Sequence, residues 1–517
     1  MIFSFRAVLL VLGLTLLLPP TVSAAPASSL IPLNSWIYPA LDKLAGLGLI
    51  ESSLQGTRPY TRYEAARQVD EASLAAAERS TPAVVPELLN RLESELSEAI
   101  AEVRGDASPS GTFKPLRRLE LAYRNRNGDG NSYPRTNARQ FSLNTNNDGI
   151  DYATGSNGEL RLAGDARLGS FLQFEWQPVV VVDKDESDLH WVNTRIAAQL
   201  GVVEISAGRQ SLWWGQGRHG SLILTNNAQP LDMLRLTNPI PLQLPWILEY
   251  LGPFRFDVFW SRLEKDRVVP EPYFAGARLN FKPLTWLELG VFRTSMFGGD
   301  GRPTIDLTEF ITVLGGDNKF SRGEDNGNSI AGFDWRLKMP FLAQTELYGE
   351  WGGEDQHDRW PTKNALLAGL YFPRLDADGR LALRLEYADL NYKGNGLGSG
   401  PVWYRHGTYQ SGYAYEQKIL GHHVGGDSRD YLAQLDWYAS PSLQLAFSLD
   451  YEERETSRLS GAAIEKHLQP GLAARWQHSA TSALTADFFY DRVENADFVE
   501  GADDRRHLVR LGLEMTF

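Results

Sequence analysis

The sequence lacks cysteine altogether, which removes disulfide bonds and thiol chemistry from its 517 residues. Beyond residue 24 it also lacks any long apolar run without charges, and its mean hydropathy is −0.31. Because a membrane-spanning helix needs about 20 apolar residues, a helical membrane protein is excluded. Gly-x-Ser-x-Gly and His-Glu-x-x-His motifs are missing as well. We therefore predict that the protein is not an enzyme, with a surface hydrolase assembled from separate strands as the alternative.

The chain has few positive charges: it contains 51 Lys and Arg residues against 64 Asp and Glu residues, so its formal net charge is −13. An acidic chain is repelled by phosphate backbones, which argues against a nucleic-acid partner. Acidic clusters at residues 183–188 and 324–326 offer oxygen ligands for Ca²⁺. Both lack the Asp-x-Asp-x-Asp-Gly loop with a distal Glu that calcium loops use. The sequence thus predicts no metal and no cofactor.

The two ends of the chain carry targeting signals. Residues 1–24 combine a basic residue, a short apolar core and small residues before a cleavage point after Ala24, the pattern of a secretory signal peptide. Residues 509–517 alternate apolar and polar side chains and finish on Phe517. An amphipathic last strand that ends on an aromatic residue is typical of bacterial outer-membrane barrels. It predicts a Gram-negative outer-membrane location and assembly by the barrel-assembly machinery.

Residues 25–105 predict a small bundle of three helices, which we place in the periplasm. Apolar side chains recur at helical spacing over residues 39–49 and again over residues 86–104. Between these segments, Thr61 and Glu64 form a capping box that predicts a helix start at the threonine.

Residues 112–517, after a linker of turn-forming residues, show the two-residue period of β-strands. Apolar and polar side chains alternate over residues 287–292, 381–388 and 443–451, among others. Tight connections, such as residues 281–284 and 439–442, alternate with long polar stretches, which is the asymmetry of a transmembrane barrel. The pattern predicts a mainly β protein, an antiparallel barrel of about 18 strands that faces outer-membrane lipid and encloses a lumen. A soluble, secreted all-β protein is the alternative.

The strand alternation breaks within residues 208–228, and we predict that residues 211–245 fold inward. Flat aromatic faces stack on sugar rings, while Arg, Asn and Gln donate hydrogen bonds to hydroxyls and Arg pairs with carboxylates. The alternative is structural: the tryptophans belong to an aromatic girdle, and the polar groups only satisfy an inward-folded loop. The predicted polysaccharide-binding residues are Trp213, Trp214, Gln216, Arg218, Asn226 and Asn227.

Arg293 is a further candidate for polysaccharide binding. It shares the parity of Leu289 and Val291, so its alternative is an outward-facing residue near the membrane interface. The same argument from parity places Gln210 in the lumen and Arg209 outside the barrel.

The broken stretch, together with the helical segments at residues 36–44 and 58–66, resembles the capsule-assembly Wzi family. Its most specific parts are Trp-Trp-Gly at 213–215 and Ser-Leu-Ile-Leu-Thr-Asn-Asn at 221–227. Members of this family are outer-membrane barrels of 18 strands with a periplasmic helical bundle, and the best-known member is a lectin that tethers capsular polysaccharide. The resemblance implies a lectin-like protein that binds capsular or extracellular polysaccharide and tethers it to the cell surface during capsule assembly. A porin or polysaccharide-export channel is the alternative.

Other segments offer further surfaces. The helical segment also resembles one S-layer-homology repeat, a module that binds cell-wall polymers, and packing against the barrel rim is the alternative use. Residues 351–360 and 402–409 mix aromatic and charged groups and are interpreted as solvated loops. His422 and His423, in a glycine-rich stretch, are also interpreted as solvated.

Overall fold

The computed structural model describes residues 25–303, 327–357, 360–391, 402–457 and 461–517. The predicted signal peptide and the acidic cluster at 324–326 lie outside the described residues. Among the described helices, none is long and apolar enough to cross a membrane. The α-helices are α2 (Ile37–Gly46), α3 (Arg62–Ala77), α4 (Val84–Glu95) and α5 (Ser97–Arg104).

Local signals set the helix boundaries. α3 begins after Thr61, whose hydroxyl accepts a hydrogen bond of 3.1 Å from the Glu64 N–H. The Glu64 carboxylate accepts hydrogen bonds from Arg67 and Gln68. The single helix predicted over residues 86–104 is wrong, because the backbone leaves the helical conformation at the buried Leu96. The break lets α4 and α5 both pack against α3.

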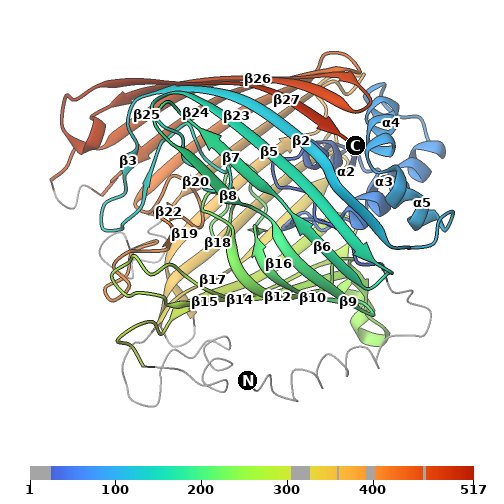
Figure 1. Cartoon of the computed structure of the whole chain (residues 1–517), viewed down its shortest axis with the longest axis horizontal. Helices are drawn as coiled ribbons and strands as arrows, with labels where there is room; N and C mark the ends of the chain where they lie inside the picture. The colour runs from blue at the N-terminus through green and yellow to red at the C-terminus, as the bar shows by residue number, and fades with distance from the viewer. Residues whose placement is uncertain (1–24, 304–326, 358–359, 392–401, 458–460) are drawn as a thin grey trace.

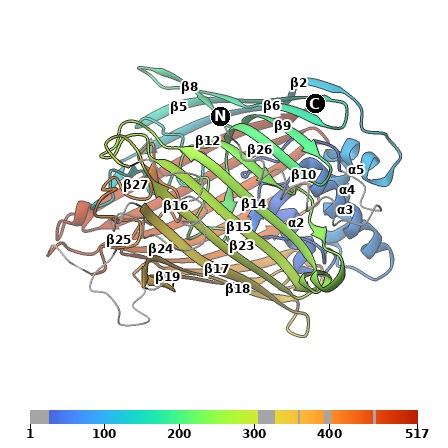
Figure 2. The same cartoon turned by 90° about the horizontal axis from the view of Figure 1, so that it is seen from below.

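Most strands close into one antiparallel barrel, as predicted (Figures 1 and 2). They are β2 (Thr112–Asn127), β5 (Gly155–Leu168), β6 (Leu172–Trp176), β7 (Pro178–Val182), β8 (Ser187–Trp191), β9 (Thr194–Leu200), β10 (Val203–Gln210), β12 (Leu231–Thr237), β13 (Leu242–Gln243), β14 (Pro253–Arg262), β15 (Tyr273–Leu284), β16 (Leu287–Phe297), β17 (Gly327–Met339), β18 (Thr345–His357), β19 (Trp360–Phe372), β20 (Leu381–Asp389), β23 (Ser428–Tyr438), β24 (Leu443–Arg454), β25 (Glu465–Ser479), β26 (Ser482–Glu494) and β27 (Asp504–Thr516).

Three strands of the wall consist of two segments each, namely β6 with β7, β8 with β9, and β12 with β13. With each pair taken as one strand, the barrel has 18 strands, in agreement with the prediction. β2 pairs with β27, from Arg118 opposite Thr516 to Asn127 opposite His507, and this seam closes the barrel.

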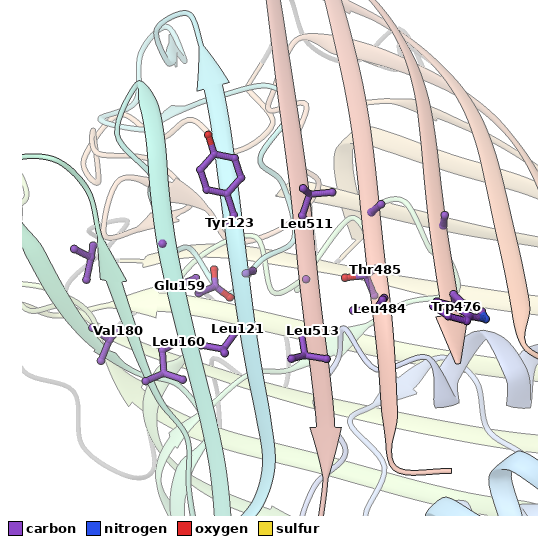
Figure 3. Close-up of a pocket in the computed structure, with 16 residues that line it drawn as sticks. Leu121, Tyr123, Glu159, Leu160, Val180, Trp476, Leu484, Thr485, Leu511 and Leu513 are labelled. Carbon is purple, nitrogen blue, oxygen red and sulfur yellow. The ribbon is translucent and has the colours of Figure 1, made fainter. Parts of the chain in front are cut away.

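Side chains alternate between the outside of the barrel and its lumen. In β27, Leu511 is 52% exposed, whereas Arg510 turns inward and pairs with Glu120 of β2. Figure 3 shows the outer face around the seam, where apolar side chains from β25, β26, β27, β2, β5 and β7 line a shallow pocket. An apolar outside around a charged lumen is the distribution that a barrel in lipid requires.

The helices pack against the rim that carries the short turns (Figure 1). Lys338, near the end of β17, donates a 2.8 Å hydrogen bond to the carbonyl of Ala45 in α2. Arg380, beside β20, forms a 2.6 Å ion pair with Glu87 of α4. The predicted tight turn at residues 439–442 lies on the same rim and joins β23 to β24.

Three predicted connections are wrong. Residues 281–284 belong to β15, which continues through a register shift before the turn. Residues 351–357 belong to β18. Residues 231–237 return to the wall as β12, because alternate side chains there face outward again. The inward-folded stretch is therefore shorter than predicted and covers residues 211–230.

Long connections fill the lumen. We call residues 211–230 the first luminal loop and residues 402–427 the second luminal loop. The two share a buried apolar cluster, in which the rings of Tyr404 and Tyr413 stack with their centroids 5.3 Å apart. The interpretation of residues 402–409 and of His422 and His423 as solvated is wrong, because Trp403, Tyr404, Tyr409 and both histidines are buried.

Candidate functional site: the filled lumen

The connection between α2 and α3, residues 47–61, reaches into the lumen, and we call it the N-terminal finger. Its strand β1 (Thr57–Arg58) pairs antiparallel with β11 (Trp213–Trp214) of the first luminal loop. This two-stranded sheet joins the helical end of the protein to the material that fills the barrel.

The barrel wall also binds the finger. Glu288 of β16 accepts hydrogen bonds from the N–H groups of Gln55 and Gly56, at 3.0 and 2.8 Å. A Cβ atom on Gly56 would lie 2.5 Å from the amide nitrogen of Gln216, so any larger residue would force the Gln216 side chain to move. The finger is therefore held by backbone contacts on both sides.

Asp42 of α2 is buried between two arginines. Its carboxylate accepts hydrogen bonds from Arg58 Nη2 at 2.5 Å and from Arg218 Nε at 2.8 Å. Burial alone raises the pKa of a carboxyl, but Arg218 and Arg58 outweigh burial and hold the pKa of Asp42 well below its usual range. One carboxylate thus connects α2, the finger and the first luminal loop.

Gln216 is held by the wall on both sides of its amide. Its nitrogen donates to Asp334 of β17 at 2.7 Å, and its oxygen accepts from Arg336 Nε at 2.9 Å. Asp334 also receives two hydrogen bonds from Arg278, at 2.6 and 3.0 Å, and both side chains are fully buried. Hydrogen bonds among the wall residues and with Gln216 of the loop therefore satisfy these buried charged groups.

Glu350 of β18 anchors the first luminal loop. Its carboxylate accepts hydrogen bonds of 2.8 Å from the Gly217 and Leu222 N–H groups and of 3.0 Å from the Ser221 hydroxyl. Bonds of this kind to a carboxylate are stronger than neutral ones. The loop is therefore fixed to the wall over residues 217–222.

The two tryptophans predicted to contact polysaccharide donate to protein groups. Trp213 Nε1 donates to the Gly217 carbonyl at 3.0 Å, and Trp214 Nε1 donates to Asp257 at 3.2 Å.

The two asparagines are bound in the same way. Asn226 donates to Asp148 at 3.2 Å. Asn227 donates to Gln140 at 2.9 Å and accepts from the same amide at 2.5 Å. Both partners belong to the connection between β2 and β5.

The structure therefore brings six predicted residues together inside the lumen. Arg218 keeps 13% of its side chain exposed, and the other five residues are at most 6% exposed. This arrangement agrees with the structural alternative, in which these groups satisfy an inward-folded loop. Their direct contact with a polysaccharide stays a prediction.

Arg293 lies apart from the other six. It follows the parity of the exposed Val291 on β16, whereas its neighbours Phe292 and Thr294 are buried on the luminal side. Its binding role also stays a prediction. The placements inferred for Gln210 and Arg209 agree with the structure, since Gln210 is fully buried and Arg209 pairs with the exposed Asp232.

The sequence interpretation missed the wall residues that hold the loop. Glu288, Asp334 and Glu350 occupy luminal positions on three successive strands. They could have been recognised from the alternation of side chains along each strand, because each lies between two residues that face outward. A run of inward charges on adjacent strands is a usable signal of a filled lumen.

Similarity to known proteins was found at three levels. The model of the family "Capsule assembly protein Wzi" matches residues 124–508. An uncharacterised 55.8 kDa protein in the cps region of Klebsiella pneumoniae is 34% identical over 173 residues. That match spans 32% of this chain and about a third, 33%, of the relative's own length.

Among solved structures, Wzi of Escherichia coli is similar, with a TM-score of 0.71 at 20% identity over 95% of this chain and 100% of that chain. It is described as an outer-membrane protein involved in group 1 capsule assembly and as a carbohydrate-binding β-barrel. OprD of Pseudomonas aeruginosa has a TM-score of 0.43 at 9% identity, over 79% of this chain and 94% of that chain. Since the family model covers most of the chain, the protein belongs to the capsule assembly protein Wzi family.

Proposed function

We propose that this protein binds a capsular or extracellular polysaccharide at the bacterial outer membrane and tethers it to the cell surface during capsule assembly. Family membership supports a role in capsule assembly. The carbohydrate binding described for the similar E. coli barrel supports a polysaccharide as the ligand. The seven residues predicted from sequence remain part of the proposal, six of them as groups that shape and hold the luminal surface.

The filled lumen is the observation that carries this proposal. A porin or export channel needs a continuous water-filled path through the barrel. Here the N-terminal finger and both luminal loops occupy the interior, and wall charges such as Glu288 and Glu350 are engaged by them. This arrangement favours a binding protein over a channel.

We place the barrel in outer-membrane lipid and the helical bundle, residues 25–105, in the periplasm. Transmembrane barrels keep their short turns on the periplasmic side, and the helices pack against the short-turn rim. We also propose that residues 112–517 form the barrel domain and that the barrel-assembly machinery inserts it.

Deleting the gene in a capsulated host is expected to release polysaccharide into the medium without stopping its synthesis. The amount of surface-bound and shed polymer, measured separately, checks this expectation. Loss of total polymer, with no shed fraction, would assign the protein to synthesis or export instead.

Replacing Arg218 by alanine is expected to weaken polysaccharide binding by about tenfold or more, because a charge-assisted hydrogen bond is worth roughly 1.5–3 kcal/mol. Its guanidinium positions the first luminal loop through Asp42. Arg209→Ala is the matched control, since Arg209 lies on the outer face and pairs with Asp232. Binding of labelled capsular polymer to the detergent-purified protein is the measurement. Equal binding by both variants would move the contact to the exposed loops.

A further inference from the structure

Four metal-ligating side chains converge where the luminal loops meet the wall. His219 belongs to the first luminal loop and His423 to the second, while Asp430 and Asp450 belong to the neighbouring strands β23 and β24. One ligand atom from each residue lies within 4.8 Å of the others. Two loops and two strands, far apart in the sequence, thus supply one cluster.

The spacing of these atoms suits a small metal ion. His219 Nε2 lies 2.9 Å from Asp450 Oδ2 and 3.5 Å from Asp430 Oδ2, and His423 Nε2 lies 3.3 Å from Asp430 Oδ2. Metal–ligand bonds of about 2.0–2.1 Å in a tetrahedral zinc site place the ligand atoms roughly 3.3 Å apart. Two of the pairs, at 3.3 and 3.5 Å, are close to that separation, and the third is a hydrogen bond of 2.9 Å between His219 and Asp450.

Several buried polar atoms of the cluster residues make no hydrogen bond within the described part of the chain. Among the described residues, no hydrogen bond is made by His423 Nε2, Asp430 Oδ2 or Asp450 Oδ1, although the first two of these atoms lie 3.3 Å apart. His423 is 1% exposed, and Asp430 is 1% exposed. Leaving such atoms unsatisfied costs about 1–3 kcal/mol each, and more when the group is charged. A cation among them would remove that cost.

The charge balance also favours a dication. With both imidazoles neutral, as metal binding requires, the two carboxylates leave a charge of about −2, which a divalent ion neutralises. The nearby Glu452 does not add to this demand, because Arg454 pairs with it at 2.6 Å. Access exists as well, since the His219 side chain is 21% exposed.

We propose that His219, His423, Asp430 and Asp450 form a binding site for a divalent transition metal, with Zn²⁺ as the best match. A mixed set of imidazole and carboxylate ligands suits zinc and its first-row neighbours. Ca²⁺ and Mg²⁺ take oxygen ligands and fit it poorly. The ion would fasten both luminal loops to the wall at a single point.

The test uses the full-length protein in detergent, stripped with a chelator and then titrated with zinc chloride. We expect one zinc ion per chain by elemental analysis and a higher unfolding temperature with zinc than with chelator. Asp450→Asn and His423→Gln are each expected to weaken zinc binding by about tenfold or more. The wild-type stoichiometry does not depend on any variant, so failure of a variant to fold leaves the test intact.

His467→Gln is the matched control. His467 is also fully buried between two carboxylates, but it contacts Asp491 through Nδ1 at 2.8 Å and Glu465 through Nε2 at 3.0 Å. These acids lie on opposite sides of the ring, so they do not surround a common point. This variant should keep its zinc. No zinc bound by the wild type, or full binding by both cluster variants, would overturn the proposal.

Discussion

Excising the first luminal loop is expected to turn a non-conducting barrel into a conducting one. Gln210 and Leu231, which flank the loop, lie directly opposite each other in the pairing of β10 with β12. A two-residue Asn-Gly turn can therefore replace residues 211–230 without disturbing the wall. The deletion removes β11, which pairs with β1, and it removes the groups that donate hydrogen bonds to Glu350. The charged wall side chains that remain face the lumen and attract water.

Single-channel recording in planar bilayers is the measurement for this deletion. The wild type should show no steady current, and the deletion variant should show a large one. Migration of unheated and heated samples on a denaturing gel verifies that each barrel is folded. A steady current through the wild type would contradict the tether and support a porin or export channel. A silent but folded deletion variant would show that other segments alone close the lumen.

Replacing Asp42 by alanine is expected to lower the free energy of unfolding by about 3–5 kcal/mol, the usual cost of removing one partner from a buried ion pair. Arg58 and Arg218 would both lose their buried counter-ion. Denaturant unfolding in detergent, followed by tryptophan fluorescence, measures this change. Asp70→Ala is the matched control, because Asp70 pairs with the partly exposed Arg104 on the bundle surface, where such pairs contribute up to about 1 kcal/mol.

The same carboxylate gives the protein a defined response to acid. The pKa of Asp42 is depressed in the folded state, so its stabilising contribution is complete above the ordinary carboxyl pKa of about 3.9 and is lost as the pH falls below that value. The wild type should therefore lose stability in strong acid more steeply than Asp42→Ala does. Parallel acid curves for the two proteins would contradict the ion-pair account.

The barrel could be predicted from the sequence because each strand has its own local alternation of apolar and polar side chains. The alternation over residues 443–451, the turn at 439–442 and the terminal strand need no knowledge of distant parts of the chain. The same parity argument placed Gln210 inside and Arg209 outside. The fold class can therefore be inferred from short-range sequence patterns.

The interior could not be predicted in the same way, because its contacts join distant residues. Arg218 and its partner Asp42 are 176 positions apart. Nothing in the local sequence of the second luminal loop distinguishes a solvated loop from a buried one, except its density of tyrosine. That density, at Tyr404, Tyr409 and Tyr413, is the signal that the solvated interpretation overlooked.

The pairing of β1 with β11 joins two segments that lie far apart in the chain. Such non-local pairing is slow to form, since a long loop must close before any contact compensates for the lost entropy. We therefore expect the finger to dock late in folding. If the seam between β2 and β27 closed while the finger was still outside, the barrel would have a complete wall toward lipid. Its helices would then be attached only through the chain that precedes Thr112, and β11 in the lumen would lack its partner β1.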